Sequence, residues 1–287
     1  MTNSITKNAL VLAGGGVAGI AWETGVLLGI QDEHPQLSEQ ILNPSTTLVG
    51  TSAGSTVAAQ IAGGGSLQRM FDRHLDDDTA EILVEIDLVE FGGMMADAMQ
   101  AANSPEDARR RLGDIALAAD TPSVALRRKV IEARLLGVDW TDWPLKITAI
   151  HTGTGQLRVF ERSSGVSLVD VVSASCAVPG IWPSVEIDGD FYMDGGMRTV
   201  ANSDLAAGAE QILILVPSPA VSRMGQSISD AELAALESSR IHVVFADDAS
   251  IEAMGLNPLD PESRKPAAIA GRELGRLIAS EVAEFWR

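Results

Sequence analysis

A serine between two glycines lies where an apolar, strand-like segment gives way to a helix-forming one. The apolar run covers residues 46–49, and Gly50, Ser52 and Gly54 follow as the helical pattern of residues 53–62 begins. The glycines leave room for a sharp strand-to-helix turn, which lifts a serine hydroxyl clear of a sheet, where a base and backbone donors can reach it. The pattern therefore predicts a nucleophile elbow with Ser52 as the nucleophile.

This elbow is the second of two strand-turn-helix units. In the first, the apolar run at 8–13 passes through three glycines into a helix-like segment at 17–31. Successive units of this kind favour an α/β fold with a mostly parallel central sheet. The chain should close with a helix at 262–286. Further strands are expected at 145–152, 156–161, 184–187, 190–193, 212–216 and 241–245.

Residues 66–137 show a helical pattern without a convincing strand. Pro105 and Pro122 mark the starts of two helices there, because proline is tolerated in the first turn. We expect a helical cap inserted into a single domain that covers residues 1–287. This segment also contains an apolar stripe, for which core packing is a simpler explanation than binding of acyl chains. The stripe consists of Phe91, Met94, Met95 and Met99.

Composition argues against several classes of function. The chain carries 39 acidic and 21 basic residues, a formal net charge of −18, and such a surface repels nucleic acids. The single cysteine, Cys176, excludes an internal disulfide and any multi-cysteine metal site. No apolar run reaches the roughly 18 residues of a membrane span, and the run at 9–13 is too short for a signal peptide. We therefore expect a cytoplasmic protein.

Three consecutive glycines, Gly14, Gly15 and Gly16, follow the first predicted strand. With Gly19 they match the spacing of a dinucleotide-binding loop, but the second strand ends without the acidic residue that would hold a ribose hydroxyl. A glycine loop before a helix can instead direct backbone N–H groups at a developing negative charge, and side chains would obstruct that approach. This favours an oxyanion hole over a nucleotide site.

A serine nucleophile also needs a base. Two of the four histidines lie in polar helix-end contexts, whereas His151 and His242 lie at strand ends and stay candidates. Asp194 is the better one, because it ends a hairpin strand and two glycines follow it. A carboxylate with an ordinary pKa of about 3.9 suits a serine poorly, so Asp194 would need desolvation and a short hydrogen bond to Ser52. Capping of the turn is its simpler structural role.

The order of motifs resembles the patatin-like phospholipases over residues 14–196. The resemblance implies a three-layer α/β/α fold, a catalytic dyad of Ser52 and Asp194 without histidine, and oxyanion donors in the glycine loop. It also implies that the third motif forms a loop and helix end beside the dyad. The motifs are the glycines at 14–16, Gly-Thr-Ser-Ala-Gly at 50–54, Ala-Ser-Cys-Ala-Val-Pro-Gly at 174–180 and Asp-Gly-Gly at 194–196.

The chain departs from that family in its glycine loop, where Ala18 stands at a position that is commonly basic. The support that such a charge gives to an oxyanion or to an anionic head group is therefore missing. This weakens the case for phospholipid specificity more than the case for ester hydrolysis. Cys176 lacks a glycine elbow and is interpreted as a buried structural residue rather than a nucleophile.

The predicted function is serine-dependent hydrolysis of a lipid or ester substrate, as by a phospholipase A, a lysophospholipase or a carboxylesterase, with no metal or cofactor. One alternative is an acyltransferase that uses the same acyl-enzyme with His151 or His242. Another is a non-catalytic module that binds nucleotide or lipid. Transient contact with a membrane or micelle would have to be apolar, through the helical cap or the segment of Trp140 and Trp143.

Overall fold

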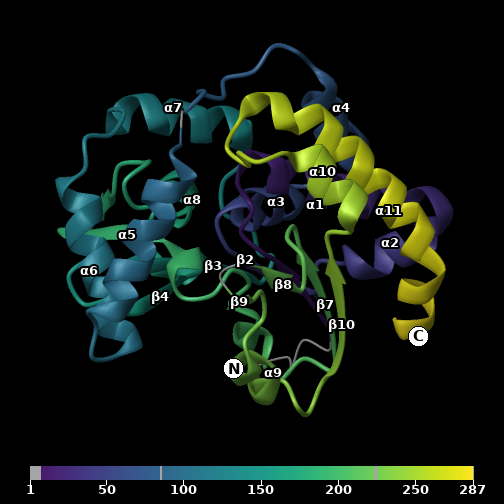
Figure 1. Cartoon of the computed structure of the whole chain (residues 1–287). Coiled ribbons are helices and arrows are strands. Elements are labelled where there is room, and N and C mark those ends of the chain that lie inside the picture. The colour runs from purple at the N-terminus through teal and green to yellow at the C-terminus, as the bar shows by residue number, and fades with distance from the viewer. Residues whose placement is uncertain (1–7, 85, 223–224, 287) are drawn as a thin grey trace.

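A mostly parallel sheet is the centre of the computed structural model, which describes residues 8–84, 86–222 and 225–286 (Figure 1). Within these residues the sheet has eight strands, and β8 (Val221–Ser222) and β9 (Gly225–Gln226) form a separate hairpin. Each predicted strand is present, with its ends within one residue of the expected ones. The eight strands are β1 (Asn8–Leu12), β2 (Thr47–Gly50), β3 (Leu145–His151), β4 (Leu157–Phe160), β5 (Val185–Ile187), β6 (Asp190–Asp194), β7 (Gln211–Val216) and β10 (Arg240–Phe245).

The strand order is β10-β7-β1-β2-β3-β6-β5, and β4 pairs with β3 off this path. The strands from β10 to β3 run parallel, whereas β6 is antiparallel to β3 and forms a hairpin with β5. Asp188 and Gly189 make the turn of that hairpin with φ angles of 57° and 87°, as the Asp-Gly pair predicts. The prediction of a mostly parallel α/β sheet is confirmed.

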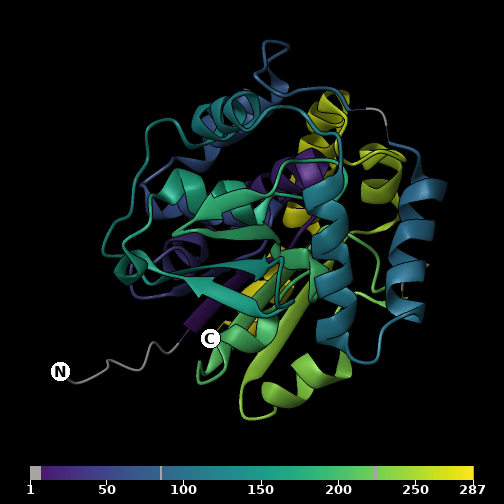
Figure 2. The same ribbon diagram turned by 90° about the vertical axis from the view of Figure 1, so that its left-hand side faces the viewer.

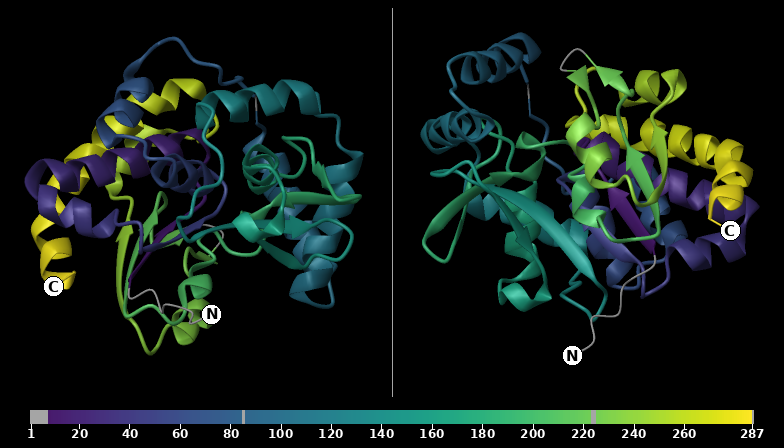
Figure 3. Two further views of the ribbon diagram at one scale, coloured as in Figure 1. Left: turned by 180° about the vertical axis from the view of Figure 1, so that it is seen from behind. Right: turned by 90° about the horizontal axis from the view of Figure 1, so that it is seen from below.

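Helices cover both faces of the sheet, which gives three layers. Side chains of β1 alternate between two cores, with Leu10 and Leu12 in one and Ala9 and Val11 in the other, as expected for a strand that is buried on both faces. Seen from below, α11 (yellow) runs along one side of the parallel strands (Figure 3). None of the helices in the described parts of the chain combines the length and the apolarity that a membrane span requires.

The first layer is the larger one. It contains α1 (Gly16–Glu33), α2 (Pro35–Ile41), α3 (Ala53–Ala62), α4 (Leu67–Leu75), α7 (Val124–Leu135), α8 (Leu168–Ser175), α10 (Asp248–Met254) and α11 (Arg264–Phe285). The second contains α5 (Leu88–Gln100), α6 (Pro105–Ala118) and α9 (Asp230–Ala235). Short 3-10 helices are η1 (Arg162–Ser164), η2 (Gly195–Met197), η3 (Ser203–Ala206) and η4 (Pro261–Ser263).

The helical segment at 66–137 is divided between the two layers. Helix α4 packs on α1 and α11, and α7 packs on α8 and α3. Only α5 and α6, adjacent and joined at one end in Figure 2, cover the opposite face, next to β3 and β6. The apolar stripe is divided too, because Met95 is buried in this small core while Met99 is exposed. Packing therefore accounts for Met95, but not for the whole stripe.

The crossing of α1 and α11 depends on four glycines. Gly25 and Gly29 on α1 face the backbone of α11, and Gly271 and Gly275 on α11 face the backbone of α1. A Cβ atom added at any of the four would lie 2.2 to 2.4 Å from a carbonyl oxygen of the other helix. Because these contacts are with backbone rather than side chains, a larger residue could not be accommodated by a change of rotamer.

Replacing Gly29 by alanine should therefore separate the two helices. We expect Gly29→Ala to lower the free energy of unfolding by about 1–3 kcal/mol, the usual cost of overpacking, despite the better helix propensity of alanine. Chemical denaturation of both variants measures this. The control is Gly93→Ala in α5, where an added Cβ meets nothing within 4 Å and stability should stay equal or rise. Equal stability of the two variants would contradict the close crossing.

Candidate active site

Strand β3 brings the ends of two other strands together. Ile147 pairs with Gly50 at the end of β2, and Ala149 pairs with Asp194 at the end of β6. Strand β4 pairs with both β3 residues, so it occupies one edge of β3 while β2 and β6 share the other. Because β2 is parallel to β3 and β6 is antiparallel to it, the last residues of β2 and β6 face each other beside Thr148. This register places the elbow next to Asp194.

The backbone at Ser52 has the shape of a nucleophile elbow. Its φ of 51° and ψ of −114° are unusual for a residue with a side chain and cost on the order of 1–3 kcal/mol. A Cβ atom at Gly54 would lie 2.0 Å from the carbonyl oxygen of Leu12, and one at Gly50 would lie 2.6 Å from Cα of Ser55. Both glycines are therefore needed for the start of α3 to pack this closely under the turn.

The Ser52 side chain lies close enough to Asp194 for a hydrogen bond between them to lower the pKa of that carboxyl. Asp194 is only 2% exposed, and its Oδ1 also accepts the N–H of Gly196 at 2.7 Å. Burial raises the pKa of Asp194 to about 6, against the two hydrogen bonds and the charge of Arg127, which lower it. Asp194 is thus a more basic carboxylate than an exposed one, and it contacts the serine directly.

The glycine loop lies against the elbow. A Cβ atom at Gly14 would be 3.5 Å from Cβ of Ser52. The N–H of Gly14 donates to the carbonyl oxygen of Val200 at 2.7 Å, so this group is already engaged. Within the described residues, the N–H groups of Gly15 and Gly16 have no acceptor. Two of the three expected oxyanion donors therefore remain available, whereas Gly14 serves to fix the loop.

The segment at 174–180 holds both Ser52 and Asp194 by their backbones. The hydroxyl of Ser175 accepts the N–H of Ser52 at 2.9 Å, and the thiol of Cys176 donates to the Ser52 carbonyl at 3.2 Å. The carbonyl of Ala177 accepts the N–H of Asp194 at 2.9 Å. Burial raises the pKa of Cys176, which keeps it as a thiol and supports its interpretation as a structural residue.

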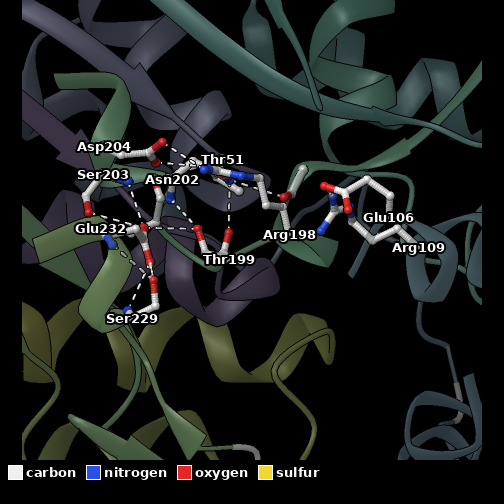
Figure 4. Close-up of polar contacts among 12 residues, drawn as sticks. Thr51, Glu106, Arg109, Arg198, Thr199, Asn202, Ser203, Asp204, Ser229 and Glu232 are labelled. Carbon is white, nitrogen blue, oxygen red and sulfur yellow. Dashed lines mark hydrogen bonds and ion pairs between the residues drawn. The ribbon is translucent and has the colours of Figure 1, made fainter. Parts of the chain in front are cut away.

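Asn202 links the residue before Ser52 to the residue after Asp194, a role that the sequence analysis missed. Its side-chain amide lies 3.1 Å from Thr51 Oγ1 and 3.1 Å from the Gly195 carbonyl (Figure 4). Asn202 is fully buried and has a φ of 49°, a backbone conformation that asparagine tolerates better than most residues. An asparagine in an otherwise unremarkable loop carries no sequence signal for this bridge.

Two carboxylates anchor the loop of Asn202 (Figure 4). Arg198 forms a two-pronged ion pair with Asp204, with both N–O distances 2.8 Å, and also donates to the Asn202 side-chain oxygen. Glu232, which is 2% exposed, accepts hydrogen bonds from the hydroxyls of Thr199 and Ser203. This network fixes the conformation of the chain just after the Asp194 turn.

The two remaining histidine candidates have other partners. The Nε2 of His151 lies 3.3 Å from Asp190, and the Nδ1 of His242 lies 3.9 Å from Glu281. Burial lowers the pKa of His242. In the described part of the chain, neither ring has a contact with Ser52 or Asp194, and no group of three or more His, Cys, Asp or Glu side chains could hold a metal ion.

Trp140 and Trp143 are part of the packing. The indole N–H of Trp140 donates to the carbonyl of Val166, and that of Trp143 donates to the carbonyl of Thr46, both at 2.8 Å. Both rings are half-buried against the main core. Their contacts fit packing beneath a loop, so this segment offers no free aromatic anchor for a membrane.

A cavity of about 940 Å³ lies between the α5–α6 pair and the segment that follows the third motif. Phe91, Met94 and Ile115 give it apolar walls, and the chain at Gly180 and Ile181 closes another side. Four acidic residues also line it, and neither Ser52 nor Asp194 does. The cavity thus borders the end of the third motif without reaching Ser52 or Asp194.

Comparison with known proteins identifies the family of this chain. The sequence profile described as patatin-like phospholipase matches residues 10–206, more than half of the chain. The chain belongs to this family. It is therefore an enzyme of the lipid acyl hydrolase class, and the family resemblance inferred from the four motifs is confirmed.

Two solved structures similar to this patatin-like chain are VipD from Legionella pneumophila and the type III effector protein ExoU. VipD is 13% identical with a TM-score of 0.45, covering 96% of this chain and 67% of its own. ExoU is 16% identical with a TM-score of 0.40, covering 96% of this chain and 53% of its own. The chain thus spans about half the length of that ExoU chain. No curated protein matches the sequence.

The raised pKa of Asp194 predicts a pH-dependent effect on stability. Between pH 3.8 and about 6 the folded chain keeps a proton that the unfolded chain has released, so this group destabilises the fold as the pH rises through that window. Asp194→Asn removes the effect. We expect its free energy of unfolding to exceed that of the wild type by about 1–3 kcal/mol at pH 8 and to approach it near pH 4.

Urea denaturation at a series of pH values measures this difference. Asp120→Asn is a control, because Asp120 is exposed and should shift stability little at any pH. A difference for Asp194→Asn that is constant from pH 4 to pH 8 would show that the carboxyl is not destabilised by burial.

Proposed function

We propose that the chain hydrolyses lipid esters, as a phospholipase A, lysophospholipase or carboxylesterase does, with Ser52 and Asp194 as a catalytic dyad. The observation that carries this proposal is the strand register that brings the elbow of Ser52 beside Asp194, a carboxylate that is almost completely buried. An exposed carboxylate is a weak base for a serine, whereas burial moves the pKa of Asp194 toward neutrality. The pair can therefore act without a histidine.

The reaction has two halves. Ser52 Oγ attacks the ester carbonyl carbon while its proton passes to Asp194, and collapse of the tetrahedral intermediate breaks the bond to the alcohol oxygen. The alcohol leaves with the proton that Asp194 held. Water then attacks the acyl-enzyme with Asp194 as base, and Ser52 recovers its proton when the acid leaves. In sum, an ester and water give a carboxylic acid and an alcohol.

The N–H groups of Gly15 and Gly16 are the proposed oxyanion donors. They lie in the loop that contacts the elbow, and they begin α1, a helix of 18 residues whose N-terminal end carries a partial positive charge. One such donor contributes about 2.7–4 kcal/mol to the stability of the transition state. The N–H of Gly14 is not included, because it already donates to Val200.

Neither alternative function gains separate support. An acyltransferase that relies on His151 or His242 would need one of these rings near the acyl-enzyme, and their contacts lie elsewhere. A nucleotide site would use the glycine loop, but the Cβ of Ser52 lies against that loop at Gly14. A lipid substrate does require at least transient contact with a bilayer or micelle.

Removal of the nucleophile should abolish the activity. We expect Ser52→Ala to lose hydrolysis of nitrophenyl esters and labelling by a fluorophosphonate probe, because the variant lacks the hydroxyl that Asp194 is proposed to activate. Cys176→Ala is the matched control. It removes the nearby thiol but keeps the Ser52 hydroxyl, so labelling should persist. Turnover by Ser52→Ala at the wild-type rate, or loss of labelling only in Cys176→Ala, would exclude Ser52 as the nucleophile.

The pH profile should report the ionisation of Asp194. A base must be deprotonated, so kcat/KM should rise about tenfold per pH unit below pH 6 and level off above it. Initial rates on one soluble ester between pH 4.5 and pH 8.5 give this profile, and Asp194→Asn should lack both the rise and most of the activity. A midpoint near pH 7 that disappears when His151 is replaced by glutamine would assign the base to histidine instead.

A further inference from the structure

We propose that Arg127, stacked on Trp182, binds the phosphate group of a phospholipid or lysophospholipid substrate of this site. This inference rests on the proposed function and narrows its substrate class. Arg127 lies on α7, outside the four motifs, and its guanidinium carbon is 3.8 Å from the centre of the Trp182 ring. Such stacking holds the plane of an arginine in one orientation and uses a face of the guanidinium rather than its N–H groups.

The guanidinium of Arg127 has no hydrogen bond or ion pair to the described residues, although the side chain is buried. Arg127 is 4% exposed, and its Nε and Nη1 are shielded from solvent without an acceptor. The buried indole N–H of Trp182 also lacks one. A buried charge without a partner is costly, and natural proteins rarely keep one without a use. The Arg127 guanidinium and the Trp182 indole on which it stacks therefore both have N–H groups without an acceptor.

Arg134, on the same face of α7, is an arginine with a structural role. It lies two turns further along and is 8% exposed, and its Nε and Nη2 donate to the two carboxylate oxygens of Glu81 at 2.7 and 2.8 Å. Burial lowers the pKa of Arg127 to about 9, with Arg134 adding to the effect, so Arg127 remains charged at neutral pH. The helix thus carries two buried charges, one neutralised by the protein and one not.

The loop under Arg127 is the one that holds the dyad. The N–H of Trp182 donates to the carbonyl of Val178 at 2.9 Å, and the preceding Ala177 accepts the N–H of Asp194. The positive charge of Arg127 acts on Asp194, where it opposes the rise in pKa. Arg127 therefore lies over the loop that holds Asp194, which is where we place the phosphate attached to the ester that Ser52 attacks.

Phosphate is the ligand that best fits this position. A guanidinium binds phosphate oxygens more strongly than neutral acceptors, through charge-assisted hydrogen bonds. With a net charge of −18, the rest of the chain repels anions, so binding of one requires a local positive group. The phosphate of a phospholipid is attached to the same glycerol as the scissile ester. Free phosphate has the same chemistry and is distinguished by experiment.

The test compares two substrates with the same acyl chain, a lysophospholipid and the corresponding monoacylglycerol. In Arg127→Met we expect the ratio of their kcat/KM values to fall by about 10- to 100-fold, as for loss of one charged hydrogen bond. Arg127→Lys keeps the charge and should give an intermediate ratio. An unchanged ratio would overturn the assignment, even if both activities fall, because Arg127 would then act through Asp194.

Inorganic phosphate separates the two sources of the anion. If it inhibits monoacylglycerol hydrolysis by the wild type but not by Arg127→Met, while the substrate ratio is unchanged, the site binds the free anion and the lipid assignment is wrong. A lower ratio of kcat/KM for the lysophospholipid to that for the monoacylglycerol in Arg127→Met supports the lipid assignment. Full activity of Ser52→Ala on both substrates would instead contradict the proposed function, because the dyad would then not catalyse the reaction that the substrate ratio measures.

Thermal unfolding excludes a merely structural role. Arg127→Met should have a Tm equal to or above that of the wild type, since an unpaired buried charge is replaced by an apolar side chain. The matched variant Arg134→Met leaves Glu81 buried without its partner and should have a clearly lower Tm. A drop for Arg127→Met as large as that for Arg134→Met would overturn the proposal.

Discussion

The shared edge of β3 is the constraint on which the rest of the site depends. Gly50 and Asp194 end their strands two residues apart along that edge, because one strand is parallel to β3 and the other antiparallel. A shift of either strand by one residue would turn its last side chain to the opposite face of the sheet. The antiparallel end of an otherwise parallel sheet is therefore what allows two strand ends, rather than a strand and a distant loop, to bring Ser52 and Asp194 together.

Several features near this edge of β3 lower the stability of the fold. Ser52 has a backbone conformation that few side chains tolerate, Asp194 is buried with a raised pKa, and Arg127 is buried without a partner. Each is unfavourable by itself, and such features persist where the surrounding structure over-determines them. The backbone contacts of the third motif and the bridge made by Asn202 hold the site from two sides, so the strained backbone of Ser52 and the buried carboxylate of Asp194 are kept in place.

Much of the fold could be predicted because its signals are local. The apolar runs, the glycine turns and the Asp-Gly hairpin each specify a strand or a turn within a few residues, and the strands follow these predictions closely. The order of motifs also pointed to Ser52 and Asp194. What the sequence did not reveal depends on contacts between distant segments: the division of the 66–137 helices between two layers, the engagement of Gly14 by Val200, the Asn202 bridge, and the difference between Arg127 and Arg134. No periodicity distinguishes two arginines seven residues apart on one helix when only their partners differ.

The burial of Ala18 limits where this chain can place a positive charge near the site. Ala18 occupies the position in the glycine loop that is commonly basic in the family, and here it is completely buried, with its N–H bonded to the carbonyl of Pro258. A lysine or arginine at that position would have to displace the packing of α1. A charge that serves the site must therefore come from another element, and α7 supplies Arg127 from the helical layer above the third motif. The departure at Ala18 then argues for a relocated anion contact rather than for a neutral substrate, since a buried and unpaired arginine is costly wherever no anion meets it.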